Sequence, residues 1–404
     1  MLRIIHTADW HLGHYLHGVS RSLEHKEFLT WLLQQLKAVN ADVLIIAGDI
    51  FDSANPSSMA QTQLYNFLVQ AKRQQPNLNI VLIGGNHDSA AYLDAPSALL
   101  RELGIRMVGG LRREGRDVDW QRLIVPLTNA KGEVEALCGA MPFLRYADLP
   151  TQKELFEGIQ LLYAELVQQM QQRAKPQHRL ILTGHCYMVQ GQVSELSERK
   201  ILGGNQHALP VSIFPEVDYV ALGHLHLAQK VGKNAHIRYS GLPIPLSFDE
   251  SHYSHGVLQV DLEHGQPAKI EHLNIPRFIE LLRLPNGKDF ADLATILALL
   301  DDMNLPDVPD IQRPYLELRI LMDKPEPNLR QQVESALAGR PVRLLKISQS
   351  FAGANTPLAD IMEQRLEELQ PLAVFEQCYR NKYDNPPPED ITALFNELLA
   401  EVQA

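Results

Sequence analysis

Five short polar motifs contain the side chains best able to carry out chemistry. Each follows a short apolar run of the kind that forms a buried strand. The motifs are Asp9-Trp10-His11, Gly48-Asp49-Ile50-Phe51-Asp52, Gly84-Gly85-Asn86-His87-Asp88, Gly184-His185 and Gly223-His224-Leu225-His226. Ligands bind at the carboxyl ends of strands in open α/β sheets, so five polar clusters at five strand ends can meet at one place. The glycines that precede four of them allow sharp turns and close approach to a ligand.

The residue types in these motifs are those of a divalent metal site. Oxygen and imidazole donors without any cysteine favour Mn²⁺, Fe or Zn²⁺ over a thiolate-rich structural zinc. Two metal ions about 3.5–4 Å apart need a bridging carboxylate, and Asp49 is the natural bridge. Asp9 and His11 with one histidine of the last motif would complete one position. Asn86 and His185 with the other histidine would complete the second. The candidate metal ligands are Asp9, His11, Asp49, Asn86, His185, His224 and His226.

Two motifs place a pair of candidate ligands two residues apart. Residues i and i+2 of an extended chain project from the same side. Asp9 and His11 are therefore expected to point to one place, as are His224 and His226. In the last motif, this spacing lets one short segment serve both metal positions.

His87 is the candidate catalytic residue. It directly follows the candidate ligand Asn86, and in regular extended chain it cannot share the inward direction of that residue. It is better placed to reach a phosphate oxygen or a leaving group than to bind metal. Asp88 is expected to orient or charge it.

Each motif alone also has an ordinary structural explanation. An isolated His-x-His pair is more often a surface or core feature than a metal site. Gly-Asp after a strand is usually a turn, and Asn-His-Asp occurs at helix starts. We favour a metal site because five such motifs occur in succession, each at the end of a strand-like run. The other eleven of the 16 histidines (16 minus five) have no such context and are expected to be structural or at the surface.

Alternating strand-like and helix-like segments must position these motifs. The predicted buried strands are Leu2–Thr7, Val43–Ala47, Ile80–Ile83, Leu180–Thr183 and Tyr219–Leu222, and the predicted helices around them include Glu24–Val39 and Glu154–Gln172. Short apolar strands separated by helices indicate sheets that are covered on both faces. The sequence therefore predicts an α/β fold.

The pattern changes around Pro276. A small α+β unit is predicted from the run Phe278–Leu284, a helix Phe290–Leu300, a strand Tyr315–Met322, a helix Leu329–Ala338 and a strand Val342–Ser348. A helical C-terminal segment follows, in which Pro388–Val402 has apolar residues along one stripe. We therefore divide the chain into residues 1–276, 277–350 and 351–404.

Composition indicates a globular chain of more than one domain. It has 404 residues, of which 45% are hydrophobic and 21% charged. No apolar run reaches the ~18 residues of a membrane span, and the N-terminus lacks the pattern of a signal peptide. Three distant cysteines make no disulfide framework, so a cytoplasmic location fits best. A net charge of −11 argues against binding nucleic acid through bulk positive charge, although bound cations and a basic partner could supply a positive field.

At the five motifs the sequence resembles the calcineurin-like metallophosphoesterases. It departs from the protein-phosphatase members, because Asp52 is followed by Ser53-Ala54 and His87 by Asp88. Further stretches, among them His6–Gly13 and Gly241–Glu250, resemble the DNA double-strand-break-repair nuclease family. This likeness covers most of the first 276 residues. Ala8 stands where many members have Ser, and Asp52 stands where archaeal relatives have His, which leaves the role of Asp52 open.

The resemblance implies an α/β/β/α sandwich with a small α+β cap facing DNA and C-terminal helices that dock a coiled-coil ATPase subunit. It implies two Mn²⁺ ions held by the seven candidate ligands, with His87 as the catalytic histidine. It further implies 3′→5′ exonuclease action on duplex ends and endonuclease action on single strands or hairpins. The assembly it implies is a homodimer within a heterotetramer.

Two other functions fit part of the pattern. A small-molecule phosphodiesterase, for example one acting on cyclic nucleotides, would use the same metals but would have no use for the residues beyond Pro276. A metal-free scaffold would keep the fold only for protein binding, but such proteins usually lose ligands, and none is missing here.

Overall fold

The computed structural model describes residues 1–115, 117–150, 153–189, 191, 208–287, 289–303, 305, 308–324 and 326–351, with positions 375, 379, 387, 388, 391, 392 and 395 beyond them. The chain divides into two compact units. The first comprises Met1–Leu282 and Val308–Tyr315, and the second comprises Arg283–Asp307 and Leu316–Ala404. Most of the predicted ATPase-docking segment, 351–404, lies outside the described residues. The three-part division of the chain therefore stays a prediction.

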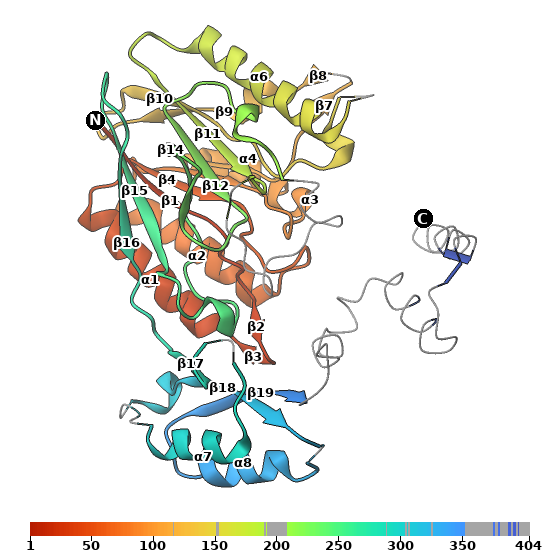
Figure 1. The fold of residues 1–404 in the computed structure, drawn as a ribbon. Helices are drawn as coiled ribbons and strands as arrows, with labels where there is room; N and C mark the ends of the chain where they lie inside the picture. Colours follow the sequence, from red (N-terminus) through yellow and green to blue (C-terminus); the bar gives the residue numbers. More distant parts are fainter. Residues whose placement is uncertain are drawn as a thin grey trace. The chain divides into compact units, whose positions relative to one another are not determined.

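The first unit contains two six-stranded sheets (Figure 1). One has the order β16-β15-β1-β4-β5-β6, in which β1, β4, β5 and β6 are parallel, β15 is antiparallel to β1, and β16 is antiparallel to β15. The bounds of its strands are β1 Leu2–Thr7, β4 Val43–Ala47, β5 Asn79–Ile83, β6 Ile105–Val108, β15 Gly256–Leu262 and β16 Lys269–Asn274. Its parallel strands all end at the same edge.

The second sheet has the order β13-β14-β12-β11-β10-β9, and its β10, β11, β12 and β14 are parallel. The bounds of its strands are β9 Ile124–Thr128, β10 Val134–Gly139, β11 Arg179–His185, β12 Tyr219–Gly223, β13 Gln229–Val231 and β14 Asn234–Tyr239. β9, β10 and β13 were not predicted from the sequence. Two of its parallel strands, β11 and β12, end in candidate ligand motifs.

The alternation of side chains along β4 explains how the layers stack. Val43 and Ile45 belong to the core shared with the second sheet, whereas Leu44 and Ile46 pack with the helices on the other side. Those helices are α1 Ser22–Ala38 and α2 Ser58–Gln74, and α6 Leu155–Arg173 covers the outer face of the second sheet (Figure 1). Two sheets between two helical layers make an α/β/β/α sandwich, which confirms the predicted fold class.

Short elements complete the first unit. They are β2 Tyr15–Leu16, β3 Val19–Ser20, α3 Ala90–Asp94, α4 Ser97–Glu102, β7 Arg113–Glu114, β8 Asp117–Val118, α5 Trp120–Leu123, η1 Tyr146–Asp148, η3 Val211–Ile213, η4 Phe248–Glu250 and η5 Asp310–Gln312. Cys138 and Cys186 are both free thiols. Among the described helices, none combines the length and the apolar character that a bilayer crossing requires.

The second unit is built on the three-stranded sheet β17-β18-β19 with two helices. Their bounds are β17 Leu281–Leu284, α7 Leu293–Asp301, β18 Tyr315–Met322, α8 Leu329–Leu337 and β19 Arg343–Phe351. Apolar side chains of both helices and of β18 are fully buried, among them Ile296, Leu318 and Val333. Burial of these side chains is the main favourable contribution to folding of this unit.

Candidate metal centre

The candidate ligands gather where the two sheets end. Ligand atoms of Asp9, His11 and Asp49 lie within 4.8 Å of one another, and so do those of Asp49, His185 and His224. Asp49 belongs to both groups. A carboxylate shared by two clusters of donors is the geometry that a bridging ligand requires.

The remaining two candidate ligands, Asn86 and His226, lie beside one group each. The side-chain oxygen of Asn86 lies 2.9 Å from Nε2 of His185 and 3.0 Å from Nδ1 of His224. The ring of His226 packs edge-on against the ring of His11, with a centroid distance of 5.6 Å. The structure thus places His224 beside Asn86, and His226 beside His11.

The backbone at these ligands is strained. Asp9, His11, Asp49 and His224 have φ values of 54°, 46°, 46° and 103°. Residues other than glycine rarely adopt this left-handed backbone conformation, which costs on the order of 1–3 kcal/mol for each residue. The prediction that Asp9 and His11 project from an extended chain was wrong. Their amides instead donate to the carbonyls of Gly48 and Asp49, each at 3.0 Å, which bends the loop after β1 around the loop after β4.

Glycines permit this close approach of loops. A Cβ at Gly85 would lie 2.2 Å from Oδ1 of Asp49, and a Cβ at Gly48 would lie 2.3 Å from Nδ1 of His185. Both distances are far below van der Waals contact. These positions accept only glycine because a ligand side chain occupies the space beside them.

Buried ligand atoms that lack a hydrogen-bond partner indicate that the site suits a cation. Among the described residues, Oδ2 of Asp9 and Nε2 of His11 are buried and have no hydrogen-bond partner. Leaving such groups unsatisfied costs about 1–3 kcal/mol each. A divalent ion would satisfy both atoms, and the mixture of carboxylate, amide and imidazole donors matches Mn²⁺, Fe or Zn²⁺.

The electrostatics of the site agree with that fit. Burial raises the pKa of Asp9 to about 6, and the nearby Asp49 charge adds to this effect while His185 opposes it. Burial alone would lower the pKa of His185, but the Asp49 carboxylate outweighs burial and raises that pKa to about 9. Two carboxylates crowded in a buried site favour positive charge beside them, whether from a proton or from a metal ion.

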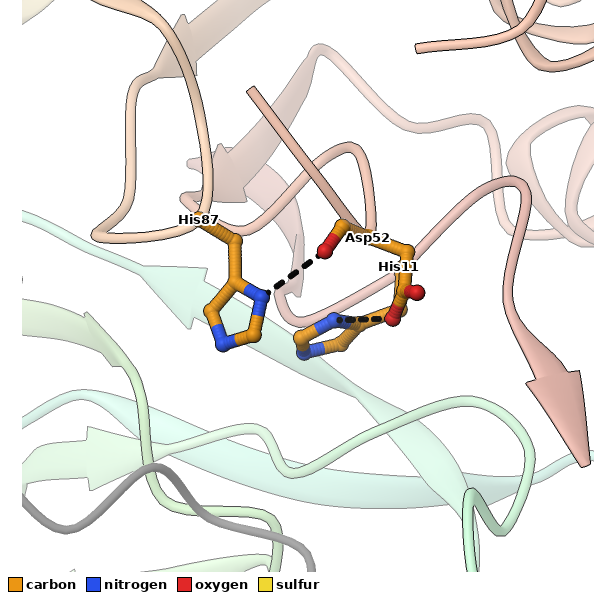
Figure 2. Close-up of side chains that lie close together, drawn as sticks. All are labelled: His11, Asp52 and His87. Atoms are coloured by element: carbon orange, nitrogen blue, oxygen red, sulfur yellow. Dashed lines mark hydrogen bonds and ion pairs between the residues drawn. The ribbon is translucent and has the colours of Figure 1, made fainter. Parts of the chain in front are cut away.

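His87 lies at the edge of this cluster (Figure 2). Its Nδ1 is 2.9 Å from the carbonyl oxygen of Asp52, and its ring stands edge-on to that of His11 at 4.7 Å. Because a carbonyl can only accept, the hydrogen of the neutral ring sits on Nδ1. The backbone N–H of His87 donates to Oδ1 of Asp49 at 2.9 Å, which ties this histidine to the candidate bridge.

Asp88 acts on the backbone around the site. Its carboxylate accepts from the N–H groups of Gly85, Ile50 and Phe51 at 2.9, 3.1 and 3.0 Å. It therefore joins the loop after β5 to the loop after β4. Asp88 was expected to orient His87, and the structure shows the Asp52 carbonyl oxygen at Nδ1 of that ring.

Sequence reasoning assigned no role to two residues that contact candidate ligands. Oδ1 of Asp52 lies 3.3 Å from Nδ1 of His11, and Oε1 of Glu250 lies 2.5 Å from Nδ1 of His226. Figure 2 shows Asp52 reaching both His11 and His87. No spacing rule links Glu250 to the ligand motifs, so only its presence in the matching stretch Gly241–Glu250 drew attention to it.

Comparison with known proteins agrees with this geometry. Residues 2–228 match the family model of the calcineurin-like phosphoesterases, and residues 277–383 match the type 5 capsule protein repressor C-terminal domain. The SbcD component of the nuclease SbcCD from Rhodobacter capsulatus is 40% identical over 388 residues, which cover 94% of each chain. The protein of the same name from Escherichia coli K12 is 33% identical over 387 residues, covering 93% of this chain and 92% of that one. The chain therefore belongs to the calcineurin-like phosphoesterases and, within them, to the SbcD family of nuclease subunits.

Proposed function

We propose that this chain is a cytoplasmic, Mn²⁺-dependent DNA nuclease subunit. It removes nucleotides from duplex ends in the 3′→5′ direction and cleaves single strands or hairpins. The observation that carries the proposal is that Asp49 is shared by two clusters of donors at the ends of both sheets. The names of the relatives support a nuclease rather than another phosphoesterase.

In this proposal two groups of residues hold the metal ions. Asp9, His11 and His226 bind one ion, Asn86, His185 and His224 bind the other, and Asp49 bridges them. Bound there, two divalent cations would lower the pKa of a water molecule and neutralise charge on the phosphoryl oxygens. The mixed donors without thiolate suit Mn²⁺.

His87 acts on the substrate. The Asp52 carbonyl keeps a hydrogen on Nδ1, so Nε2 is the ring atom that gains and delivers a proton. In the transition state of an in-line displacement, His87 stabilises the developing charge on a phosphoryl oxygen and assists departure of the 3′ oxygen. The N–H of His87, bonded to Asp49, holds the histidine at a defined distance from the bridge.

The rest of the chain contacts DNA and binds a partner protein. The relatives are named as subunits of SbcCD, so we infer an SbcC-type coiled-coil ATPase as partner, in a heterotetramer that contains two copies of this chain. Residues 277–350 form the DNA-facing cap. Residues 351–404 dock the ATPase through the apolar stripe of Pro388–Val402, a segment of which the structure describes few residues.

A nuclease assay tests the proposal. Linear duplex and hairpin DNA are incubated with Mn²⁺ and the full chain, with and without the coexpressed ATPase subunit. We expect chelator-sensitive 3′→5′ degradation of the duplex and nicking of the hairpin. Hydrolysis of cyclic nucleotides with no action on DNA would favour a small-molecule phosphodiesterase instead. A protein that binds no metal and cleaves neither substrate would indicate a scaffold.

A further inference from the structure

Behind three of the four candidate imidazole ligands lies a polar group that is not itself a candidate ligand. For His226, that group is Glu250, whose Oε1 lies 2.5 Å from Nδ1. Glu250 is completely buried. Its contact leaves Nε2 as the nitrogen of His226 that can bind a metal ion.

Glu250 is held in place by backbone donors. Its second oxygen accepts from the N–H groups of Leu246 and Ser247 at 2.8 and 3.1 Å. These residues lead into the short helix η4, of which Glu250 is the last residue. A carboxylate with this many partners cannot rotate away from His226 without leaving buried N–H groups unsatisfied.

A second carboxylate stands behind the other imidazole of the same position. Oδ1 of Asp52 lies 3.3 Å from Nδ1 of His11, an ion-pair distance, and 3.0 Å from Nδ1 of His14. The other ring nitrogen of His14 lies 3.2 Å from the carbonyl of Leu246. The stretch that positions Glu250 therefore also supports Asp52, through His14.

The second metal position differs. Nδ1 of His185 lies 2.9 Å from the carbonyl oxygen of Ala47, which is a neutral acceptor. Asn86, the donor between His185 and His224, is also neutral. The position around Asp9 thus has carboxylates both as direct donors and behind its imidazoles, whereas the position around Asn86 depends on the shared Asp49 for negative charge.

We propose that Glu250 is a positioning residue for His226 and that, together with Asp52, it makes the position of Asp9, His11 and His226 the tighter of the two. A carboxylate behind a histidine ligand fixes its tautomer and ring orientation and makes the metal-binding nitrogen more basic. One ion then binds first at this position, and a second ion completes the centre at lower affinity. This inference rests on the ligand set of the proposed function.

Titration calorimetry of Mn²⁺ into the chelator-treated full chain tests it. Wild-type protein should bind two ions in two resolved steps. At one equivalent, electron paramagnetic resonance should show an isolated Mn²⁺ ion rather than a spin-coupled pair. Glu250→Gln, which keeps the shape of the side chain, should weaken the first step by about 10–100-fold, the range found when such outer partners are removed. The second step should change much less.

Glu317→Gln is the matched control. Glu317 is also a buried carboxylate, with Arg283 at 2.5 Å and the Ser348 hydroxyl at 2.9 Å, but it belongs to the second unit. The Glu317→Gln variant should leave both Mn²⁺-binding steps unchanged. Glu250→Asp, which restores the charge with a shorter side chain, should recover part of the lost affinity if its far-UV circular dichroism matches that of wild type.

Two outcomes would overturn the inference: a first step unaltered in Glu250→Gln, or a loss confined to the second step. The ligand set itself is tested by His226→Ala and His185→Ala. If both variants keep two tightly bound ions, the proposed function fails at its metal centre. If they lose metal while Glu250→Gln does not, only the role given to Glu250 fails.

Discussion

The carbonyl oxygen of Asp52 lies 2.9 Å from Nδ1 of His87, so the backbone of the loop after β4 determines which nitrogen of that ring carries its hydrogen. The contact does not depend on the side chain at position 52. The carboxylate of the same residue lies 3.3 Å from His11. One residue thus supports a candidate ligand with its side chain and the candidate catalytic histidine with its main chain.

His87→Ala should separate metal binding from turnover. The ring contacts a carbonyl and lies beside the ligands, so its removal should leave both metal ions and DNA binding in place. The rate should fall by about 10²–10⁴-fold, the usual contribution of a positioned acid or base. Metal analysis and single-turnover nuclease kinetics check this. A fall in metal content would make His87 a ligand and remove its catalytic role.

Asp49→Ala should abolish activity and reduce bound metal well below the wild-type amount. Asp49 is the residue common to both clusters of donors, so its loss affects both positions. Elemental analysis of the purified variant gives the metal content directly. Two tightly retained ions in this variant would show that the bridge is another residue.

Gly85→Ala should reduce metal binding without removing any ligand. The new Cβ would lie 2.2 Å from Oδ1 of Asp49, so either the carboxylate or the loop must move. Gly158→Ala is a suitable control, because there the added methyl meets only the side chain of Leu149, at 3.2 Å. Calorimetry should show weak Mn²⁺ binding for the first variant and normal binding for the second.

His6 should make the protein sensitive to mild acid. This fully buried residue accepts from the hydroxyl of Tyr219 and donates to the carbonyl of Leu222, at 2.9 and 3.2 Å, so its neutral form is satisfied. Burial lowers its pKa from 6.5 to about 3. Between these values the unfolded chain binds a proton that the folded chain does not, so stability falls as the pH falls through this window.

The loss attributable to His6 is about 2 kcal/mol between pH 7.5 and pH 5. His6→Gln has no titrating group and should be less stable than wild type at pH 7.5 but lose less on acidification. Urea unfolding midpoints at the two pH values measure the difference. Equal acid sensitivity in both proteins would mean that other groups dominate.

Deletion of the residues after Gly353 should leave a folded, Mn²⁺-dependent nuclease that no longer copurifies with the ATPase subunit. The deleted stretch includes the apolar stripe of Pro388–Val402. If the stripe instead packs on the chain's own core, the truncated protein should be insoluble or metal-free. A truncated protein that still binds the ATPase would place the docking surface elsewhere.

Much of the fold could be predicted because the strands are continuous apolar runs. Leu2–Thr7 and Val43–Ala47 were predicted with the bounds that the structure gives. Helix α2 was missed although Ser57 caps it and Leu64, Phe67 and Leu68 are buried along one face. Its many glutamines obscured the apolar stripe.

The candidate site could be predicted as a set of residues but not as a geometry. Spacing identified the candidate ligands, but it could not assign His224 and His226 to separate metal positions. That assignment depends on the turn at His224, whose backbone is left-handed. The Glu250 contact was also beyond reach. It joins residues 24 positions apart with no periodic relation, and it exists only because the chain folds back after β14.

The candidate ligands come from both sheets, with Asp9, Asp49 and Asn86 on the loops of one and His185 and His224 on the other. An ion bound between them would link the two sheets of the sandwich. Metal supply is then coupled to the lifetime of the protein as well as to catalysis, since binding only to the folded state raises its stability with the free ion concentration. In a cell with little free metal, the two sheets would separate more often. Proteases would then degrade the chain sooner.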